Sequence, residues 1–268
     1  MKRTLLFLLT LLAASGAQRE RAQAIALASP ELLARPRPPG VAPSRTSPVF
    51  RAREGEWKFN LHSYPAHHDG KFRAVGSSGR VDEDSPTQLI RYATSVDGHR
   101  WSGSGILADD PDGPEGPGSW IVNPEGAVRR FFGDGQRSKF LYRSVSRDGG
   151  ETWPAPVRTN YPDAGSKNFA GRLSNGWYSL INNPNPDSRD PLGISFSEDG
   201  WRCSRPLALR SDAPEERYPG RAKNRFSLQY PHAIEKNGSL WVIHSTTKED
   251  IEIPEHRIAD FRLEKEQT

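Results

Sequence analysis

Cysteine is nearly missing from this sequence, since Cys203 is the only one among 268 residues. A single thiol cannot close a disulfide within the chain, and it cannot supply a cysteine cluster for zinc or iron–sulfur binding. His67, His68 and Asp69 have the composition of a metal site, but they surround a predicted hairpin turn away from the expected binding face. We therefore expect no metal site and no cofactor.

Long apolar runs are scarce as well. The one extended run, residues 5–14, is too short to span a bilayer comfortably. Lys2 and Arg3 precede this run, and the small residues 15–17 follow it. This layout is typical of a secretory signal peptide over residues 1–17, with a buried helix as the alternative interpretation. We therefore expect an exported protein, secreted or periplasmic, without a membrane span.

A dense basic segment is also missing. The formal net charge is only +4, whereas a nucleic-acid-binding protein usually shows a basic stripe or a known motif. Neither is visible, so we expect no nucleic-acid partner. The mild positive excess is compatible with an anionic small ligand, and the sequence leaves the oligomeric state open.

Glycine and proline, in contrast, are plentiful, with 24 and 23 residues, while only 34% of the chain is hydrophobic. This composition favours many turns and short strands over long helices. Residues 18–56 contain the stretch ARPRPPGVAPSRTSP, which predicts a Pro/Arg-rich linker with little structure of its own. We expect the folded domain to cover residues 57–268.

A short motif recurs three times along the chain. SVDGHRW begins at Ser95, SRDGGETW at Ser146 and SEDGWRC at Ser197, with a constant spacing of 51 residues. Each copy follows a run that alternates apolar and polar residues, as a half-buried strand does. Three copies in one register indicate a structural repeat.

Glycine-containing dipeptides recur along the chain as well, at a different position of the repeating unit from the Ser-x-Asp motif. The dipeptides stand between pairs of strand-like runs and suit tight hairpins; they are Asp69-Gly70, Glu125-Gly126, Asn175-Gly176 and Asn237-Gly238. The repeating unit is therefore four antiparallel strands in about 50 residues, which is typical of a propeller blade.

The Ser-x-Asp motifs predict tight turns. The hydroxyl and the carboxylate can accept hydrogen bonds from backbone N–H groups, and the aromatic that follows can pack between sheets. In the third copy, Cys203 takes the place of the aromatic. We interpret the following residues as structural rather than catalytic: Ser95, Asp97, Trp101, Ser146, Asp148, Trp153, Ser197 and Asp199.

These repeats resemble the Asp-box, Ser-x-Asp-x-Gly-x-Thr-Trp, of the sialidase (neuraminidase) family and of its relatives with bacterial neuraminidase repeats. SRDGGETW fits that pattern in full, and the other two copies fit in part. The resemblance covers roughly residues 57–260. It implies an all-β fold, a sialidase-like β-propeller of four-stranded antiparallel blades. The family has six blades, and about four are recognisable in this sequence.

The resemblance also implies a site. Sialidases use a nucleophilic tyrosine assisted by a glutamate, an acid/base aspartate, and three arginines that bind the sugar carboxylate. Tyr230, in YPHAIEKNGSLWVIHS, matches the tyrosine-bearing strand. Arg189 matches the third arginine, and Arg137 lies near the second. Asp82 or Asp84 lies where the acid/base aspartate is expected.

Two positions depart from the family pattern. The first arginine of the family lies in Arg-Ile-Pro, where this chain has Ser63-Tyr64-Pro65; the candidate replacements are His62, Arg51 and Arg53. The glutamate is expected near residues 118–120, which hold Gly, Ser and Trp, and Glu115 is the nearest carboxylate. Further candidates for binding substrate are Arg172, Arg225, His232 and Asn183.

Each site residue also has a structural interpretation. Tyr230 can be a core aromatic, Arg189 and Arg137 can be solvated loop charges, and residues 82–84 can be a solvated acidic loop. Two functional hypotheses follow. The first is an exported sialidase-like glycoside hydrolase that acts on sialic acid or another acidic sugar. The second is a catalytically inactive Asp-box propeller that binds carbohydrate or a protein partner.

Overall fold

The computed structural model of the chain describes residues 27–28, 41–82, 88–102, 105–108, 128–132, 139–147, 154–155, 157–218 and 226–262. The regular structure of these residues is β-strand, apart from the short 3-10 helix η1 (Ile258–Asp260). None of the helical structure described has both the length and the apolar character needed to cross a membrane.

The strands form four antiparallel sheets. One sheet contains β2 (Phe59–His68), β3 (Lys71–Gly79), β4 (Leu89–Ser95) and β5 (Gly105–Ala108). A second contains β6 (Val128–Phe132), β7 (Phe140–Ser146) and β8 (Val157–Pro162). A third contains β9 (Phe169–Arg172), β10 (Tyr178–Asn182), β11 (Leu192–Ser197) and β12 (Leu207–Arg210). The fourth contains β13 (Leu228–Lys236), β14 (Ser239–Thr246), β15 (Asp250–Arg257) and, at its outer edge, β1 (Arg45–Phe50).

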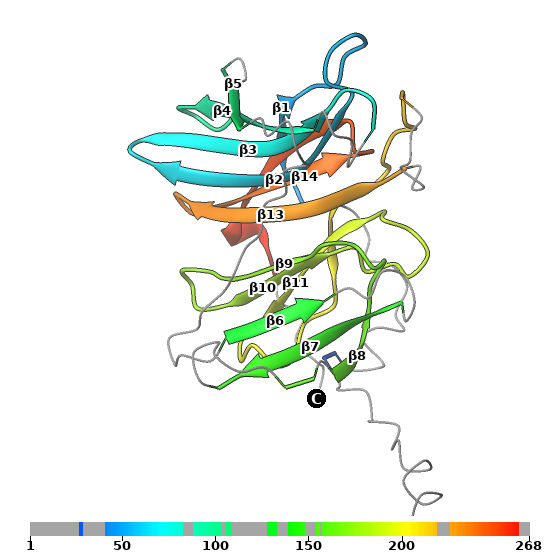
Figure 1. The fold of residues 1–268 in the computed structure, drawn as a ribbon. Coiled ribbons are helices and arrows are strands. Elements are labelled where there is room, and N and C mark those ends of the chain that lie inside the picture. Colours follow the sequence, from blue (N-terminus) through cyan, green and yellow to red (C-terminus); the bar gives the residue numbers. More distant parts are fainter. Residues whose placement is uncertain are drawn as a thin grey trace, which may run out of the picture.

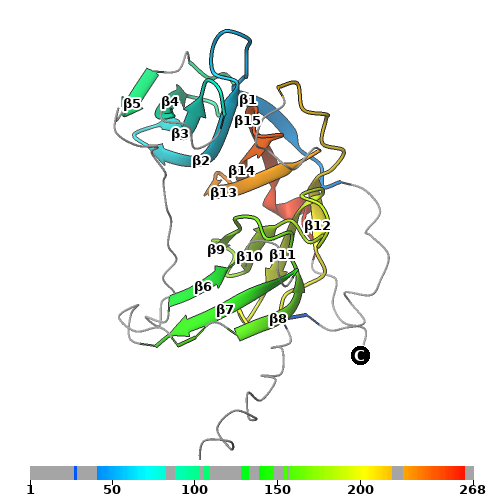
Figure 2. The same cartoon turned by 45° about the vertical axis from the view of Figure 1, so that its right-hand side comes forward.

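The sheets follow one another as the blades of a propeller (Figure 1). Strand β13 contacts β2 on one side and β9 on the other, so the first strands of neighbouring blades face each other. Figure 2 places the β2–β5 blade and the β6–β8 blade at opposite ends of the series. The described sheets do not close into a barrel. The predicted all-β, sialidase-like propeller is confirmed, with four blades in the part of the chain that the structure describes.

Two of the predicted hairpins have the expected left-handed turn residues. The φ angles are +50° at Asp69 and +68° at Gly70, and they are +52° at Asn237 and +74° at Gly238. Two successive positive φ angles match the right-handed twist of the flanking strands, which explains the choice of Asp-Gly and Asn-Gly. Gly176 also has a positive φ, at the turn between β9 and β10. The fourth dipeptide, at 125–126, lies outside the described residues.

The Ser-x-Asp turn after β4 is held by side-chain bonds to its backbone. Asp97 Oδ1 accepts hydrogen bonds from the N–H groups of Arg100, at 2.8 Å, and His99, at 2.9 Å. Ser95 Oγ accepts one from the N–H of Gly98, at 2.9 Å. The backbone donors of Arg100 and His99 hold the pKa of Asp97 well below its usual range.

The turn after β11 repeats this arrangement. Asp199 Oδ1 accepts from the N–H groups of Trp201, at 2.7 Å, and Arg202, at 2.9 Å. Ser197 Oγ donates to the same carboxylate at 2.9 Å. In both turns the aspartate accepts hydrogen bonds from backbone N–H groups, and in the first turn the serine does so as well. In the middle copy, Ser146 ends β7, while Asp148 and Trp153 lie outside the described residues.

The N-terminal segment, predicted as a linker with little structure of its own over residues 18–56, contains a strand. Within it, β1 pairs antiparallel with β15, from Arg45 opposite Glu255 to Phe50 opposite Ile251. The strand reads RTSPVF and buries Val49 and Phe50 in the core between the β13–β15 and β2–β5 blades. Pairing with the edge of β15 gives this Pro-containing strand the backbone partners that its sequence does not reveal.

Gly98 shows why a glycine follows the aspartate of the Ser-x-Asp motif. Its φ is +76°, and a Cβ atom at this position would lie 2.4 Å from Cζ3 of Trp241. Trp241, on β14, stacks against His99 and Phe72, with ring centroids 4.9 Å and 4.7 Å away. The turn therefore packs its backbone directly against an aromatic of the neighbouring blade, where no side chain fits.

We predict that Gly98→Ala destabilises the protein much more than Gly70→Ala. Both glycines have positive φ, but a Cβ atom at Gly70 meets nothing within 4 Å. Gly70→Ala should cost only the left-handed conformation, about 1–2 kcal/mol, while the clash with Trp241 should add about 1–3 kcal/mol in Gly98→Ala. Urea unfolding of both variants measures the difference, and equal losses would contradict this packing.

Candidate functional site

Two β-bulges in neighbouring blades bring His62 and Tyr230 together. The β2–β3 register shifts between Leu61 and Tyr64, and the β13–β14 register shifts between Gln229 and His232. Inside the bulges, His62 has φ +51° and Tyr230 has φ +57°. The two rings lie with their centroids 4.6 Å apart. Because bulges turn side chains out of the regular alternation, both rings point across the junction between the blades.

Further positive φ angles cluster near this pair. Thr247 has φ +53° and Lys248 has φ +61°, in the turn between β14 and β15. Left-handed conformations cost non-glycine residues energy, most of all β-branched ones such as threonine. Such strain concentrates at functional sites, where the surrounding structure holds it in place. The cluster therefore marks this junction as the candidate site.

Arg189 approaches Tyr230 from the connection between β10 and β11. Its Nη1 donates to Oε1 of Gln229 and lies 3.4 Å from the Tyr230 hydroxyl. Its Cζ lies 5.6 Å from the centroid of the Tyr230 ring. Tyr230 and Arg189, which the family resemblance assigns to one site, are thus in direct contact across two blades.

Two lysines complete a cationic group around the same ring. Lys167, from the connection between β8 and β9, has its Nζ 5.7 Å from the Tyr230 centroid. Lys248, which is only 4% exposed, has its Nζ 5.9 Å from that centroid. We call Lys167, Arg189 and Lys248 the cationic triad. Its members come from three different connections and place three cationic side chains around one aromatic ring.

The rings of the central strands continue below this site. His232 on β13 stacks between Tyr64 on β2, at 4.8 Å, and Phe169 on β9, at 4.6 Å. Burial is the main cause that lowers the pKa of His232 to about 4. Burial, with the charges of Lys167 and Lys248, lowers the pKa of His62 to about 3. At neutral pH both imidazoles are therefore uncharged rings, and the floor of the site is aromatic under a cationic rim.

Asn183 holds the site together from within. It is fully buried, and its Nδ2 donates to the carbonyl oxygens of Arg189, at 2.9 Å, Pro191, at 3.1 Å, and Leu228, at 2.7 Å. These bonds tie the connection that carries Arg189 to the start of β13. Asn183 therefore positions Arg189, whereas the sequence placed it among the substrate-binding candidates.

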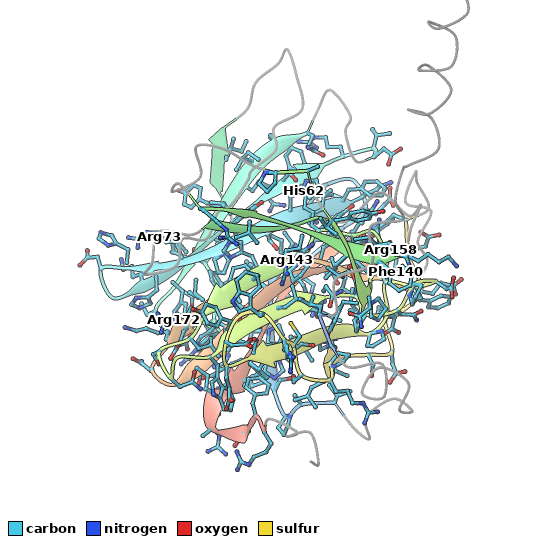
Figure 3. The ribbon with its side chains drawn as sticks, turned by 90° about the horizontal axis from the view of Figure 1, so that it is seen from below. His62, Arg73, Phe140, Arg143, Arg158 and Arg172 are labelled. Carbon is cyan, nitrogen blue, oxygen red and sulfur yellow. The ribbon has the colours of Figure 1, made fainter. Side chains whose placement is uncertain are left out.

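Other predicted site residues lie elsewhere. Arg172 is exposed at the hairpin end of β9, with its Cζ 5.5 Å from the ring of Tyr178. Figure 3 draws Arg172 on the same side as Arg73, and away from His62. Arg172 therefore does not join the Tyr230 cluster.

Of the predicted carboxylates, only Asp82 lies within the described residues. Asp82 is half-buried just beyond the end of β3, and no described contact joins it to Tyr230. The remaining candidates fall outside the described residues; they are Asp84, Glu115, Arg137 and Arg225. Of the residues in the cluster, sequence reasoning missed the roles of Lys167 and Lys248. Lys248 lies in the segment STTKED, which has three hydroxyl residues before the lysine, and nothing in the sequence around Lys167 marks it.

Comparisons with known proteins agree with the fold. The model of the family of BNR repeat-like domains matches residues 66–243. A solved structure named as a sialidase is 20% identical, with a TM-score of 0.63 over 80% of this chain and 33% of that one. The chain thus spans about a third of that sialidase. The α-L-arabinofuranosidase PaAbf62A from Podospora anserina is 12% identical, with a TM-score of 0.50 over 81% of this chain and 97% of that one. No curated protein matches the sequence.

We predict that lowering the pH from 7 to 5 destabilises the fold. The pKa values of four buried or half-buried histidines are lowered from 6.5, to about 3 for His62 and His244 and to about 4 for His232 and His256. In this window the unfolded chain binds protons that the folded chain does not, so stability rises with pH. Each histidine should cost up to about 2 kcal/mol at pH 5.

Urea unfolding at both pH values measures this loss, and NMR titration of the imidazoles assigns it. The His62→Phe variant, which keeps a ring beside Tyr230, should lose less stability between pH 7 and pH 5 than the natural protein. Equal stability of the natural protein at both pH values would contradict the burial of neutral histidines.

Proposed function

The chain belongs to the family of BNR repeat-like domains, and from this premise we propose that it is a sialidase-like glycoside hydrolase that acts on an acidic sugar. The observation that carries the proposal is the Tyr230 cluster. A tyrosine hydroxyl lies 3.4 Å from an arginine Nη1, inside a group of three cations contributed by separate connections. An anionic sugar is the ligand whose charge this arrangement complements.

The proposed mechanism is retaining. Tyr230 gives its phenolic proton to a base, for which Glu115 is the proposed candidate, and its Oη attacks the anomeric carbon to form a covalent glycosyl–tyrosine bond while an acid donates a proton to the departing oxygen. A water molecule then attacks the same carbon and gives its proton to the conjugate base of that acid, while the bond to tyrosine breaks and the phenolate takes its proton back from the first base. Asp82 or Asp84 is the proposed acid/base. Arg189 orients the phenol and stabilises negative charge on its oxygen.

A second candidate function is supported by one observation. Within the described chain, Tyr230 contacts Arg189, Lys167, Lys248 and His62 but no carboxylate. A tyrosine nucleophile ordinarily needs an adjacent base to accept its proton. The alternative is therefore a propeller that binds carbohydrate, or a protein partner, at the same face without hydrolysing it.

We predict that Tyr230→Phe abolishes hydrolysis of a fluorogenic sialoside, lowering kcat by more than about 1,000-fold. The phenylalanine keeps the ring but removes the attacking oxygen. Tyr178→Phe, at the hairpin end of β10, is the matched control and should leave kcat unchanged. Turnover by the Tyr230→Phe variant equal to that of the natural protein would reject the nucleophile. Binding on a glycan array with no turnover by the natural protein would favour the second candidate.

Export is a separate part of the proposal, supported by the signal-peptide layout of residues 1–17. Cleavage after Ala17 would remove the apolar run before the domain folds. N-terminal sequencing of protein recovered outside the cytoplasm tests it, and recovery of the uncleaved chain in the cytoplasm alone would reject it.

A further inference from the structure

Gln229 stands directly before Tyr230, where the β13–β14 register shifts. Its side chain is fully buried, and both ends of its amide form hydrogen bonds. The oxygen Oε1 accepts from Nη1 of Arg189, and Nε2 donates to the hydroxyl of Ser227 at 2.8 Å. The amide can take only this orientation, because a guanidinium donates hydrogen bonds and accepts none. Gln229 therefore presents its acceptor to Arg189.

The bond to Gln229 controls where the guanidinium of Arg189 points. An Nη group carries two N–H bonds at a fixed angle in the guanidinium plane. When Gln229 holds one of them, the direction of the other is restricted, and Nη1 lies 3.4 Å from the Tyr230 hydroxyl. Asn183 holds the backbone carbonyl of Arg189, so the two amides fix the two ends of this residue.

Gln229 also holds Arg189 without cancelling its charge. Elsewhere in this fold an arginine is held by carboxylates, as Arg217 is by Glu249 and Asp250. Within the described part of the chain, Arg189 forms no ion pair and its Nη2 forms no hydrogen bond. A neutral amide supplies an acceptor and leaves the positive charge in place. Because Arg189 is only half-buried, its charge and its Nη2 donors remain for an anionic ligand.

We propose that Gln229 is a positioning residue of the Tyr230 site. It aims Arg189 at the tyrosine hydroxyl and, because it is neutral, preserves the charge with which Arg189 binds the acidic group of a sugar. Gln229 is itself fully buried, so its effect on a ligand passes through Arg189. This inference rests on the proposed function, since it names the residue on which recognition of the acidic group depends at the same site.

The first test is calorimetric binding of N-acetylneuraminic acid to the full chain, as the natural protein and as the Gln229→Glu variant. The variant keeps the length and the acceptor of the side chain, and the hydroxyl of Ser227 can donate to it. Its carboxylate neutralises Arg189, so we expect the affinity to fall at least tenfold. Asn175→Asp makes the same change at the exposed turn between β9 and β10 and should leave the affinity unchanged. Unchanged affinity in Gln229→Glu would overturn the inference.

A double-mutant cycle tests whether Gln229 acts through Arg189. Gln229→Met removes both hydrogen bonds at nearly constant volume and should weaken binding at least threefold in the natural protein. In the Arg189→Met background the same change should have no further effect, because the residue that it positions is gone. Losses that simply add would show that Gln229 supports only the fold, and would overturn the inference. Thermal melting checks that each variant is folded.

A spectroscopic test needs no ligand. In NMR of isotopically labelled arginine, the bond to Gln229 should slow rotation about the Cζ–Nη1 bond of Arg189 and keep its Nη1 and Nη2 signals apart. Gln229→Met should merge the two signals, whereas Asn175→Asp should not. Merged signals in the natural protein would overturn the positioning role.

The outcomes separate this inference from the proposed function. If N-acetylneuraminic acid does not bind and the sialoside is not hydrolysed, the proposed function fails together with the recognition of an acidic group. The NMR signals of Arg189 then still decide whether Gln229 positions it. If the sugar binds but Gln229→Glu and Gln229→Met bind it as tightly as the natural protein, the inference fails and the acidic-sugar site remains.

Discussion

Charge burial in the last blade is the constraint on which the candidate site depends. Glu249 and Asp250 stand at the turn into β15 with side chains only 1% and 10% exposed. Buried carboxylates need paired cations, because an uncompensated charge in the interior is very costly. Arg217 binds both carboxylates, at 2.8 Å and 2.6 Å, and Arg51, just after β1, binds Asp250 at 2.6 Å. Three segments that are distant in sequence are thereby fixed around one turn.

These ion pairs hold in place a strained turn that positions Lys248 at the site. Thr247 and Lys248 immediately precede the paired carboxylates and adopt left-handed φ angles, which cost on the order of 1–3 kcal/mol each. A short turn with strained residues holds its shape only when its neighbours are fixed. The N–H of Asn60 donates to the carbonyl of Lys248 at 2.8 Å, which ties the turn to the strand that also carries His62. The position of Lys248 beside Tyr230 is thus set by contacts outside the site.

The repeat could be recognised from the sequence because each copy contains residues that form the same kinds of local turn. Ser95 and Ser197 begin turns with nearly the same hydrogen bonds, and Asn237-Gly238 forms the hairpin that this dipeptide favours. Strand β1 was not predicted, because its partner β15 lies at the other end of the chain and the segment around β1 is rich in proline and arginine. Tyr230 and Arg189 were found through a family pattern. The role of Lys167 depends on the packing of three blades, which no local signal records.

The same geometry links ligand binding to the stability of the fold. Lys167, Arg189 and Lys248 share one aromatic ring, and like charges in a partly buried site repel one another more strongly than in water. The ring offsets part of this repulsion through cation–π attraction, and the neutral state of His62 avoids adding a fourth charge. If an acidic sugar binds at this site as proposed, only the folded state gains, because the unfolded chain does not assemble the three cations. Such a ligand would therefore raise the stability of the blades that build the site.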